Sequence, residues 1–221
     1  GWYEYLPLAE MPLLKGLANW YYDWLNQPTD GPFWYPISPN KQYAQVNVPV
    51  CHFGGWFDTF QQGTIDNFTG MSRAARTQHT RDSQKMIMGP WEHGPPSADK
   101  TTVGEFDFGP EAGRDFNELR LPWYDYWVQG IENGVMDEPP VSYFTMGINE
   151  WRTAATWPPR GVDNVSFYFG AGQSGFAESL NDGVLLTELP HGTEGVDSYL
   201  YDPANPVRTH GGGLIYPGNP P

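Results

Sequence analysis

Two short apolar runs in the first half of the chain predict the strands of a sheet. One covers residues 46–53 ("VNVPVCHF") and the other residues 84–88 ("QKMIM"), and turn residues bound both. Runs of this length between turns are typical of buried strands. Pro49 lies in the first run and cannot donate a backbone hydrogen bond, so we expect pairing to be restricted there.

Apolar residues recur at helical spacing in three other places, over residues 11–25, 60–76 and 116–130. Pro122 lies in the third segment and should form its first turn or kink it. Polar residues lead from the second helix to Asp82, and residues 89–113 are expected to be mostly loop. The order strand, helix, strand, helix predicts an α/β sheet with parallel strands.

The alternation of predicted strands and helices ends near Glu138. Beyond it the chain contains short β-prone segments separated by turn residues, namely "VSYFTMG", "VSFYFG", "GVLLTEL" and "DSYLYDP". Such spacing is typical of an antiparallel sandwich or jelly roll. We therefore predict a domain boundary near residue 138.

Composition narrows the class of protein. The 221 residues suffice for one large or two small domains, and 39% of them are hydrophobic. A net charge of −14 opposes binding to nucleic acid. The single cysteine, Cys51, excludes an internal disulfide. No apolar run approaches the roughly 18 residues of a membrane helix, so no membrane partner is expected, and the compartment stays open.

Asp58 and His93 each follow a predicted strand by a few residues, after glycines that permit a sharp turn. In an open α/β sheet, catalytic groups gather beyond the carboxyl ends of the strands. An aspartate that accepts a hydrogen bond from a histidine fixes its tautomer, and the histidine can then act as a general base. In the plainer interpretation, Asp58 caps the helix that follows it and His93 is structural.

Other chemistry is less well supported by the sequence. Ser97 lacks a strained turn, and Cys51 lies inside a predicted strand, so neither is expected to be the nucleophile. His52, Asp58 and His93 are acceptable metal ligands, but no tight ligand motif joins them, and we expect no metal. Four aromatic residues near the predicted site could form an apolar pocket wall or could simply pack beneath the loops. They are Trp56, Phe57, Phe60 and Trp91.

The segments "VPVCHFGGWFDTFQQGTIDNF" and "MIMGPWEHG" resemble the Asp and His segments of the cocaine esterase/X-Pro dipeptidyl-peptidase family of serine hydrolases. This family includes α-amino acid ester hydrolases and glutaryl cephalosporin acylases. "PPVSYFTMGINEWRTAATWPP" and "YLYDPANPVRTHGGG" are similar to the opening part of its C-terminal jelly roll. "WYYDWLNQPTDGPFW" is similar to the end of its helical cap. The resemblance covers nearly the whole chain in the same order.

The resemblance implies that Asp58 and His93 are two members of a Ser–Asp–His triad. It also implies a serine in a Gly-x-Ser-Tyr-x-Gly turn, which this sequence lacks. In α/β hydrolases the serine comes first along the chain, so we expect it before residue 1 of a longer protein. The implied fold is the C-terminal part of an α/β-hydrolase domain followed by the beginning of a jelly roll. The implied divisions are the end of the cap (1–40), the hydrolase part (41–137) and a truncated jelly roll (138–221).

The first hypothesis is thus a fragment of a serine hydrolase that cleaves ester or amide bonds through an acyl-enzyme, with no cofactor. Its substrate would be a small ester or amide, or a short Xaa-Pro peptide, and the fragment alone should be inactive. The alternative is a non-catalytic binding or assembly module that uses the β-rich region. Exposed sheet edges predict a homo-oligomer or association with the missing N-terminal part.

Overall fold

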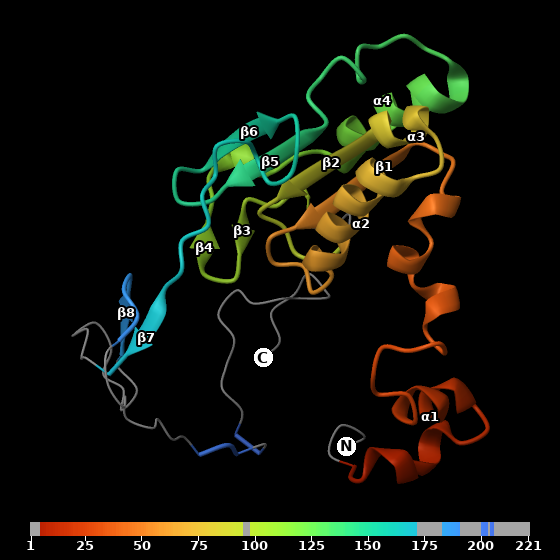
Figure 1. The fold of residues 1–221 in the computed structure, drawn as a ribbon, viewed down its shortest axis with the longest axis vertical. Coiled ribbons are helices and arrows are strands. Elements are labelled where there is room, and N and C mark those ends of the chain that lie inside the picture. The colour runs from red at the N-terminus through yellow and green to blue at the C-terminus, as the bar shows by residue number, and fades with distance from the viewer. Residues whose placement is uncertain (1–4, 95–97, 172–182, 191–199, 203, 206–221) are drawn as a thin grey trace.

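The computed structural model of the protein describes residues 5–94, 98–171, 183–190, 200–202 and 204–205 (Figure 1). Its main sheet has the strand order β1-β2-β5-β6. The strands of this sheet are β1 (Val50–Gly55), β2 (Gln84–Gly89), β5 (Val141–Thr145) and β6 (Glu150–Ala154). The helices are α1 (Asn19–Leu25), α2 (Gln61–Ala74), α3 (Gln78–Asp82) and α4 (Phe116–Gln129). Two-stranded pairs are formed by β3 (Thr102–Val103) with β4 (Phe106–Asp107), and by β7 (Tyr168–Gly170) with β8 (Val184–Leu186).

The two predicted strands are confirmed, and they lie side by side in parallel. Val50 is level with Gln84, and the pairing runs in register to Gly55 and Gly89. The first strand begins at Val50 rather than at residue 46, directly after Pro49. Proline has no N–H to donate to a ladder, which explains why regular pairing starts only behind it.

Helices cover both faces of this parallel pair (Figure 1). On one face, Phe68 and Ile65 of α2 pack on Met86, Met88 and Val141. On the other face, Phe116 and Leu119 of α4 pack near Ile87, with Cys51 and Phe53 of β1. All six residues of β2 are buried, because β2 has a strand on each side and a helix over each face.

The helical predictions are confirmed for α2 and α4 and only partly for the N-terminal segment. Residues 11–25 hold the short helix α1, preceded by the 3-10 turn Pro12–Leu14. Pro122 lies inside α4 rather than in its first turn. The polar stretch before Asp82, for which the sequence predicted no element, contains α3. This helix begins after Thr77 because the Thr77 side chain accepts a hydrogen bond from the Thr80 amide. Of residues 89–113, those that the structure describes are largely loop as expected, with short elements only.

The sheet continues past residue 138, where the sequence predicted a boundary. β5 pairs with β2 in parallel and with β6 antiparallel, so the "VSYFTMG" segment extends the α/β sheet and makes it mixed. Beyond β6, the described residues contain one antiparallel pair, β7 with β8. Most of the "DSYLYDP" segment lies outside the described residues. The predicted jelly roll is therefore not confirmed, and the division into domains stays a prediction.

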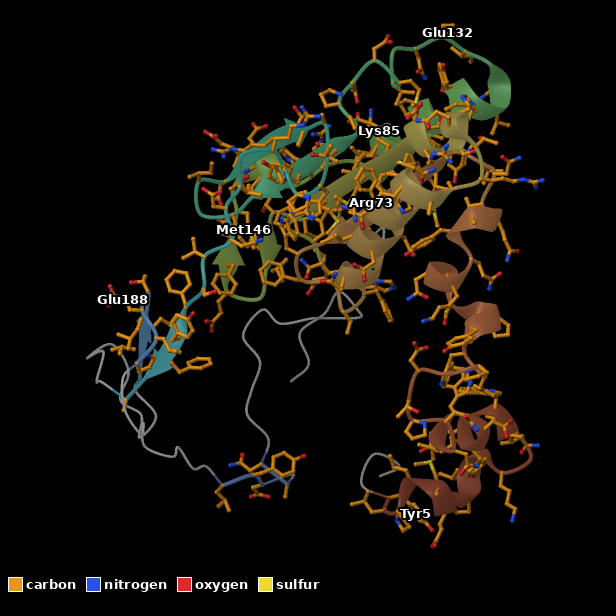
Figure 2. All side chains as sticks on the ribbon, in the orientation of Figure 1. Tyr5, Arg73, Lys85, Glu132, Met146 and Glu188 are labelled. Atoms are coloured by element: carbon orange, nitrogen blue, oxygen red, sulfur yellow. The ribbon has the colours of Figure 1, made fainter. Side chains whose placement is uncertain are left out.

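Residues 5–45 form a chain of short helices that leads away from the sheet, with α1 remote from the strands (Figure 1) and Tyr5 at the far end (Figure 2). Aromatic rings join its parts, with the centroids of Trp20 and Trp24 4.5 Å apart and those of Trp24 and Trp34 5.8 Å apart. Within the described residues, no helix is both long enough and apolar enough to span a lipid bilayer.

Candidate active site

The loops that follow β1 and β2 are bound to each other through their backbones. The amide of Trp56 donates to the carbonyl of Gly89 at 2.9 Å, and the amide of Phe57 donates to the carbonyl of Trp91 at 3.0 Å. Both loops begin at the carboxyl ends of adjacent parallel strands, where the chain direction brings them together. The backbone thus fixes the separation of Asp58 and His93 before their side chains meet.

Gly55 makes this close approach possible. A Cβ atom at residue 55 would overlap the carbonyl oxygen of Trp91, and that oxygen is held by its hydrogen bond from Phe57. Backbone atoms cannot move aside as the end of a flexible side chain can. The glycine is therefore required by steric space, and the predicted sharp turn after β1 depends on it.

Asp58 uses both carboxylate oxygens. Its Oδ1 accepts a hydrogen bond of 2.7 Å from the Phe60 amide just before α2, and its Oδ2 lies 3.0 Å from Nδ1 of His93. The side chain is 8% exposed. The two oxygens thus have different partners, a turn amide and His93. Asp58 does not cap α2, because the N-cap residue of that helix is Phe60 and no side chain caps it.

His93 is held at one ring nitrogen and remains accessible. Its side chain is 42% exposed, and the ring of Phe60 lies 5.1 Å away, centroid to centroid, in an edge-on arrangement. With Nδ1 directed at Asp58, Nε2 is the atom that can take a proton from a hydroxyl. This is the geometry that a general base in a catalytic triad needs.

A cavity of about 200 Å³ adjoins the pair. Asp58, Glu92 and His93 contribute to its wall, and its apolar side comes from β1, α4 and the loop after β2. The apolar wall consists of Phe53, Trp91, Ala98 and Phe116. A small apolar cavity with a few polar groups is typical of a ligand site.

The four predicted pocket aromatics have different positions. Trp91 lines the cavity, but it is 4% exposed and its Nε1 donates to the carbonyl of Ala112, so it also supports the loop. Phe60 faces His93. Trp56 donates from Nε1 to the carbonyl of Phe144, and Phe57 packs on Phe106 and Phe108, so these two do not reach the cavity.

The other residues considered as nucleophiles or metal ligands show no sign of a catalytic role among those that the structure describes. Burial raises the pKa of the Cys51 thiol to about 12, which keeps it protonated. His52 is buried and bound to Gln84, and burial lowers its pKa. Ser97 lies outside the described residues. Over the part of the chain that the structure describes, no three His, Cys, Asp or Glu side chains are grouped so as to hold a metal ion.

Sequence reasoning missed Phe53, Glu92, Ala98 and Phe116 as wall residues. The place of Glu92 next to His93 was a usable signal, because titratable side chains tend to cluster at functional sites. Phe116 had no signal in its own segment. It reaches the site only because α4 packs back across the sheet.

Comparison with known proteins places this chain in a family. The family model of X-Pro dipeptidyl-peptidases (S15 family) matches residues 4–95, which include Asp58 and His93. The model of the X-Pro dipeptidyl-peptidase C-terminal non-catalytic domain matches residues 133–217. The chain belongs to the cocaine esterase/X-Pro dipeptidyl-peptidase family. Membership confirms the resemblance seen in the sequence.

Several similar proteins match most of the chain. The cocaine esterase of Rhodococcus sp. is 31% identical over 95% of the chain. A solved α-amino acid ester hydrolase is 25% identical, with a TM-score of 0.57 over 72% of the chain. An aminopeptidase from a marine sediment archaeon of the Thaumarchaeota, 24% identical, shares the fold with a TM-score of 0.65 over 88% of the chain.

The chain spans about a third of the length of these similar proteins. It covers 35% of the Rhodococcus esterase, 26% of the ester hydrolase and 30% of the archaeal aminopeptidase.

Proposed function

We propose that this chain supplies the acid–base half of a serine hydrolase that cleaves ester or amide bonds. The observation that carries the proposal is the 3.0 Å contact between Asp58 Oδ2 and His93 Nδ1 at the carboxyl ends of adjacent parallel strands. Membership of a family of esterases and X-Pro dipeptidyl-peptidases supports it. The sequence contains no Gly-x-Ser-x-Gly, so the nucleophile would come from a segment outside residues 1–221.

In this mechanism His93 takes the proton of the serine hydroxyl through Nε2 while the serine oxygen attacks the substrate carbonyl. Asp58 holds the ring and stabilises the imidazolium that forms. His93 then gives the proton to the leaving alcohol or amine, and an acyl-enzyme remains. In the second half His93 activates water in the same way, the acyl group leaves as the acid, and the serine is regenerated.

The proposed substrate classes come from the names of similar proteins and from the resemblance of the sequence to a family that includes acylases. One member is named a cocaine esterase, another an α-amino acid ester hydrolase, and the family model an X-Pro dipeptidyl-peptidase. We propose a small ester, a side-chain amide of the kind that acylases cleave, or a short Xaa-Pro peptide. For residues 138–221 we propose part of a jelly-roll domain, supported by the C-terminal domain model that matches residues 133–217.

The test uses the full-length product of the gene that encodes this chain, with p-nitrophenyl esters and an Xaa-Pro p-nitroanilide as substrates. His93→Ala should lower kcat about 10⁴- to 10⁶-fold, and Asp58→Asn about 10⁴-fold, because the base is removed or loses its tautomer. A serine-directed phosphonate should abolish activity. His79→Ala is the matched control, because His79 is exposed on α3 and its loss should leave kcat unchanged.

Two outcomes would contradict the proposal. One is full activity in the His93→Ala variant. The other is hydrolysis by the isolated 221-residue chain at a rate above its own His93→Ala control, since that would place a nucleophile inside residues 1–221.

A further inference from the structure

A buried carboxylate precedes His93 in the chain. The Glu92 side chain is 6% exposed, and its Oε2 lies 3.5 Å from Nζ of Lys100, whose side chain is 39% exposed. Carboxylates are seldom buried without a counter-charge, because removing the charge from water is costly. The ion pair therefore ties the residue next to His93 to a residue just before β3.

The rest of the loop after β2 is held at Trp91. Its carbonyl accepts the Phe57 amide at 3.0 Å, and its Nε1 donates to the carbonyl of Ala112 at 3.0 Å. His93 itself has a half-exposed ring, so packing alone restricts its orientation weakly. The position of the imidazole thus depends on the backbone of residues 91–93, and Glu92 is the buried side chain closest to it along the chain.

We propose that Glu92, through its ion pair with Lys100, is a positioning residue for His93. The pair holds the backbone at residue 92 so that Nδ1 of His93 stays within hydrogen-bonding distance of Asp58. Its catalytic meaning rests on the proposed function, but the hydrogen bond itself can be measured without any substrate. Glu92 also lines the cavity, so Glu92→Gln is the informative change, because it removes the charge and keeps the shape.

The experiment observes the imidazole proton directly in the ¹⁵N-labelled 221-residue chain. A ring N–H bound to a carboxylate gives a downfield proton resonance, assigned here by its loss in Asp58→Asn. In Glu92→Gln we expect this proton to exchange with water at least tenfold faster, while Lys100→Arg retains the parent behaviour. Asp30→Asn is the matched control, since it removes a carboxylate from the exposed Lys41–Asp30 ion pair, 3.0 Å long, and should change nothing at His93.

The proposal is overturned if the Glu92→Gln resonance is as narrow and as slow to exchange as in the parent, or if the parent chain gives no such resonance. If Glu92→Gln does not unfold cooperatively, Lys100→Gln carries the same test. In the full-length protein, Glu92→Gln should lower kcat about tenfold with KM unchanged, and Lys100→Arg should not. If the full-length protein has no hydrolase activity and Glu92→Gln still accelerates exchange, the proposed function fails and the positioning role stands.

Discussion

At the scale of single residues, Gly55 shows how a steric requirement determines the site. The turn after β1 passes so close to the carbonyl of Trp91 that no side chain fits between them. The same approach places Asp58 beside His93. A change at Gly55 should therefore affect stability and the Asp58–His93 hydrogen bond together.

We predict that Gly55→Ala destabilises the protein by about 1–3 kcal/mol, because overpacking against backbone forces the loops apart. Chemical denaturation measures the loss, and the downfield imidazole resonance should disappear in the same variant. The control is Gly63→Ala on α2, where a Cβ would meet nothing within 4 Å. That variant should be stabilised by about 0.5–1 kcal/mol, because alanine favours the helix. Equal stabilities of the two variants would contradict the steric argument.

Cys51 is a second residue whose behaviour follows from its surroundings. Since burial raises the pKa of the thiol to about 12, only a minute fraction is thiolate at pH 8. We expect the native thiol to react with a disulfide reagent about a thousandfold more slowly than a free cysteine of pKa about 8.5. Reaction should become immediate in guanidinium chloride. Fast labelling of the native chain would show that the strand opens readily or that the thiol is not buried.

At the scale of elements, a buried polar network joins β1, β2 and α3. His52 Nε2 lies 3.0 Å from Gln84 Oε1, and Gln84 Nε2 donates to the carbonyl of Thr80 at 2.7 Å. His52 also contacts the ring of Phe68 on α2, with 5.9 Å between centroids. The network satisfies side-chain polar groups of two paired strands, away from the candidate active site.

This network makes stability depend on pH. Burial lowers the pKa of His52 in the folded state, against a smaller opposing effect of the Gln84 hydrogen bond. The unfolded chain therefore binds the proton more readily, and stability should fall as pH drops below about 6.5, by at most about 1.4 kcal/mol per pH unit. Denaturation at pH 7 and pH 5 should show a larger loss in the parent than in His52→Gln. Parallel losses in the two proteins would refute the assignment to His52.

At the scale of the whole molecule, the sheet has an open edge at β1 among the described residues. The amide of Val50 donates to Ser83 and that of Trp56 to Gly89, so the alternating residues Cys51 and Phe53 direct their backbone groups away from β2. The strand has no charged side chain or proline to discourage pairing. β2 is different, because it lies between β1 and β5, and Met86 and Met88 are completely buried.

We therefore expect this chain to associate through the edge of β1. The partner would be the segment that carries the proposed nucleophile, or a second copy of this chain. Hydrogen exchange should find the amides of Cys51 and Phe53 fast in the monomer and slow once the N-terminal segment of the full-length protein is added. The amides of His52 and Gly54, which face β2, are the internal control and should be slow in both states. A monomer at high concentration with all four amides equally slow would contradict an open edge.

The sequence by itself determined the paired strands β1 and β2, the helices α2 and α4, and the pair of catalytic candidates. A continuous apolar run located β2, and apolar residues at helical spacing located α2 and α4. Both patterns are local, because the buried side chains of one element lie close together in the sequence. The residues after each strand pointed to Asp58 and His93, because ligand groups collect at strand ends in parallel sheets. Prediction from the sequence was less reliable where apolar residues do not recur at regular spacing, as in the short helices before β1 and in α3.

Only the tertiary structure decided which segments become neighbours. The "VSYFTMG" segment is β-prone by composition, but its pairing with β2 depends on backbone hydrogen bonds that any strand can make, so the sequence could not reveal its partner. Likewise, Trp56 and Trp91 each follow a strand after a short turn, so the sequence does not distinguish them. In the structure, Trp56 donates a hydrogen bond to Phe144 and Trp91 lines the cavity. The ion pair between Glu92 and Lys100 also belongs to this class, because charge pairing is set by distance in space and leaves no periodic pattern along the chain.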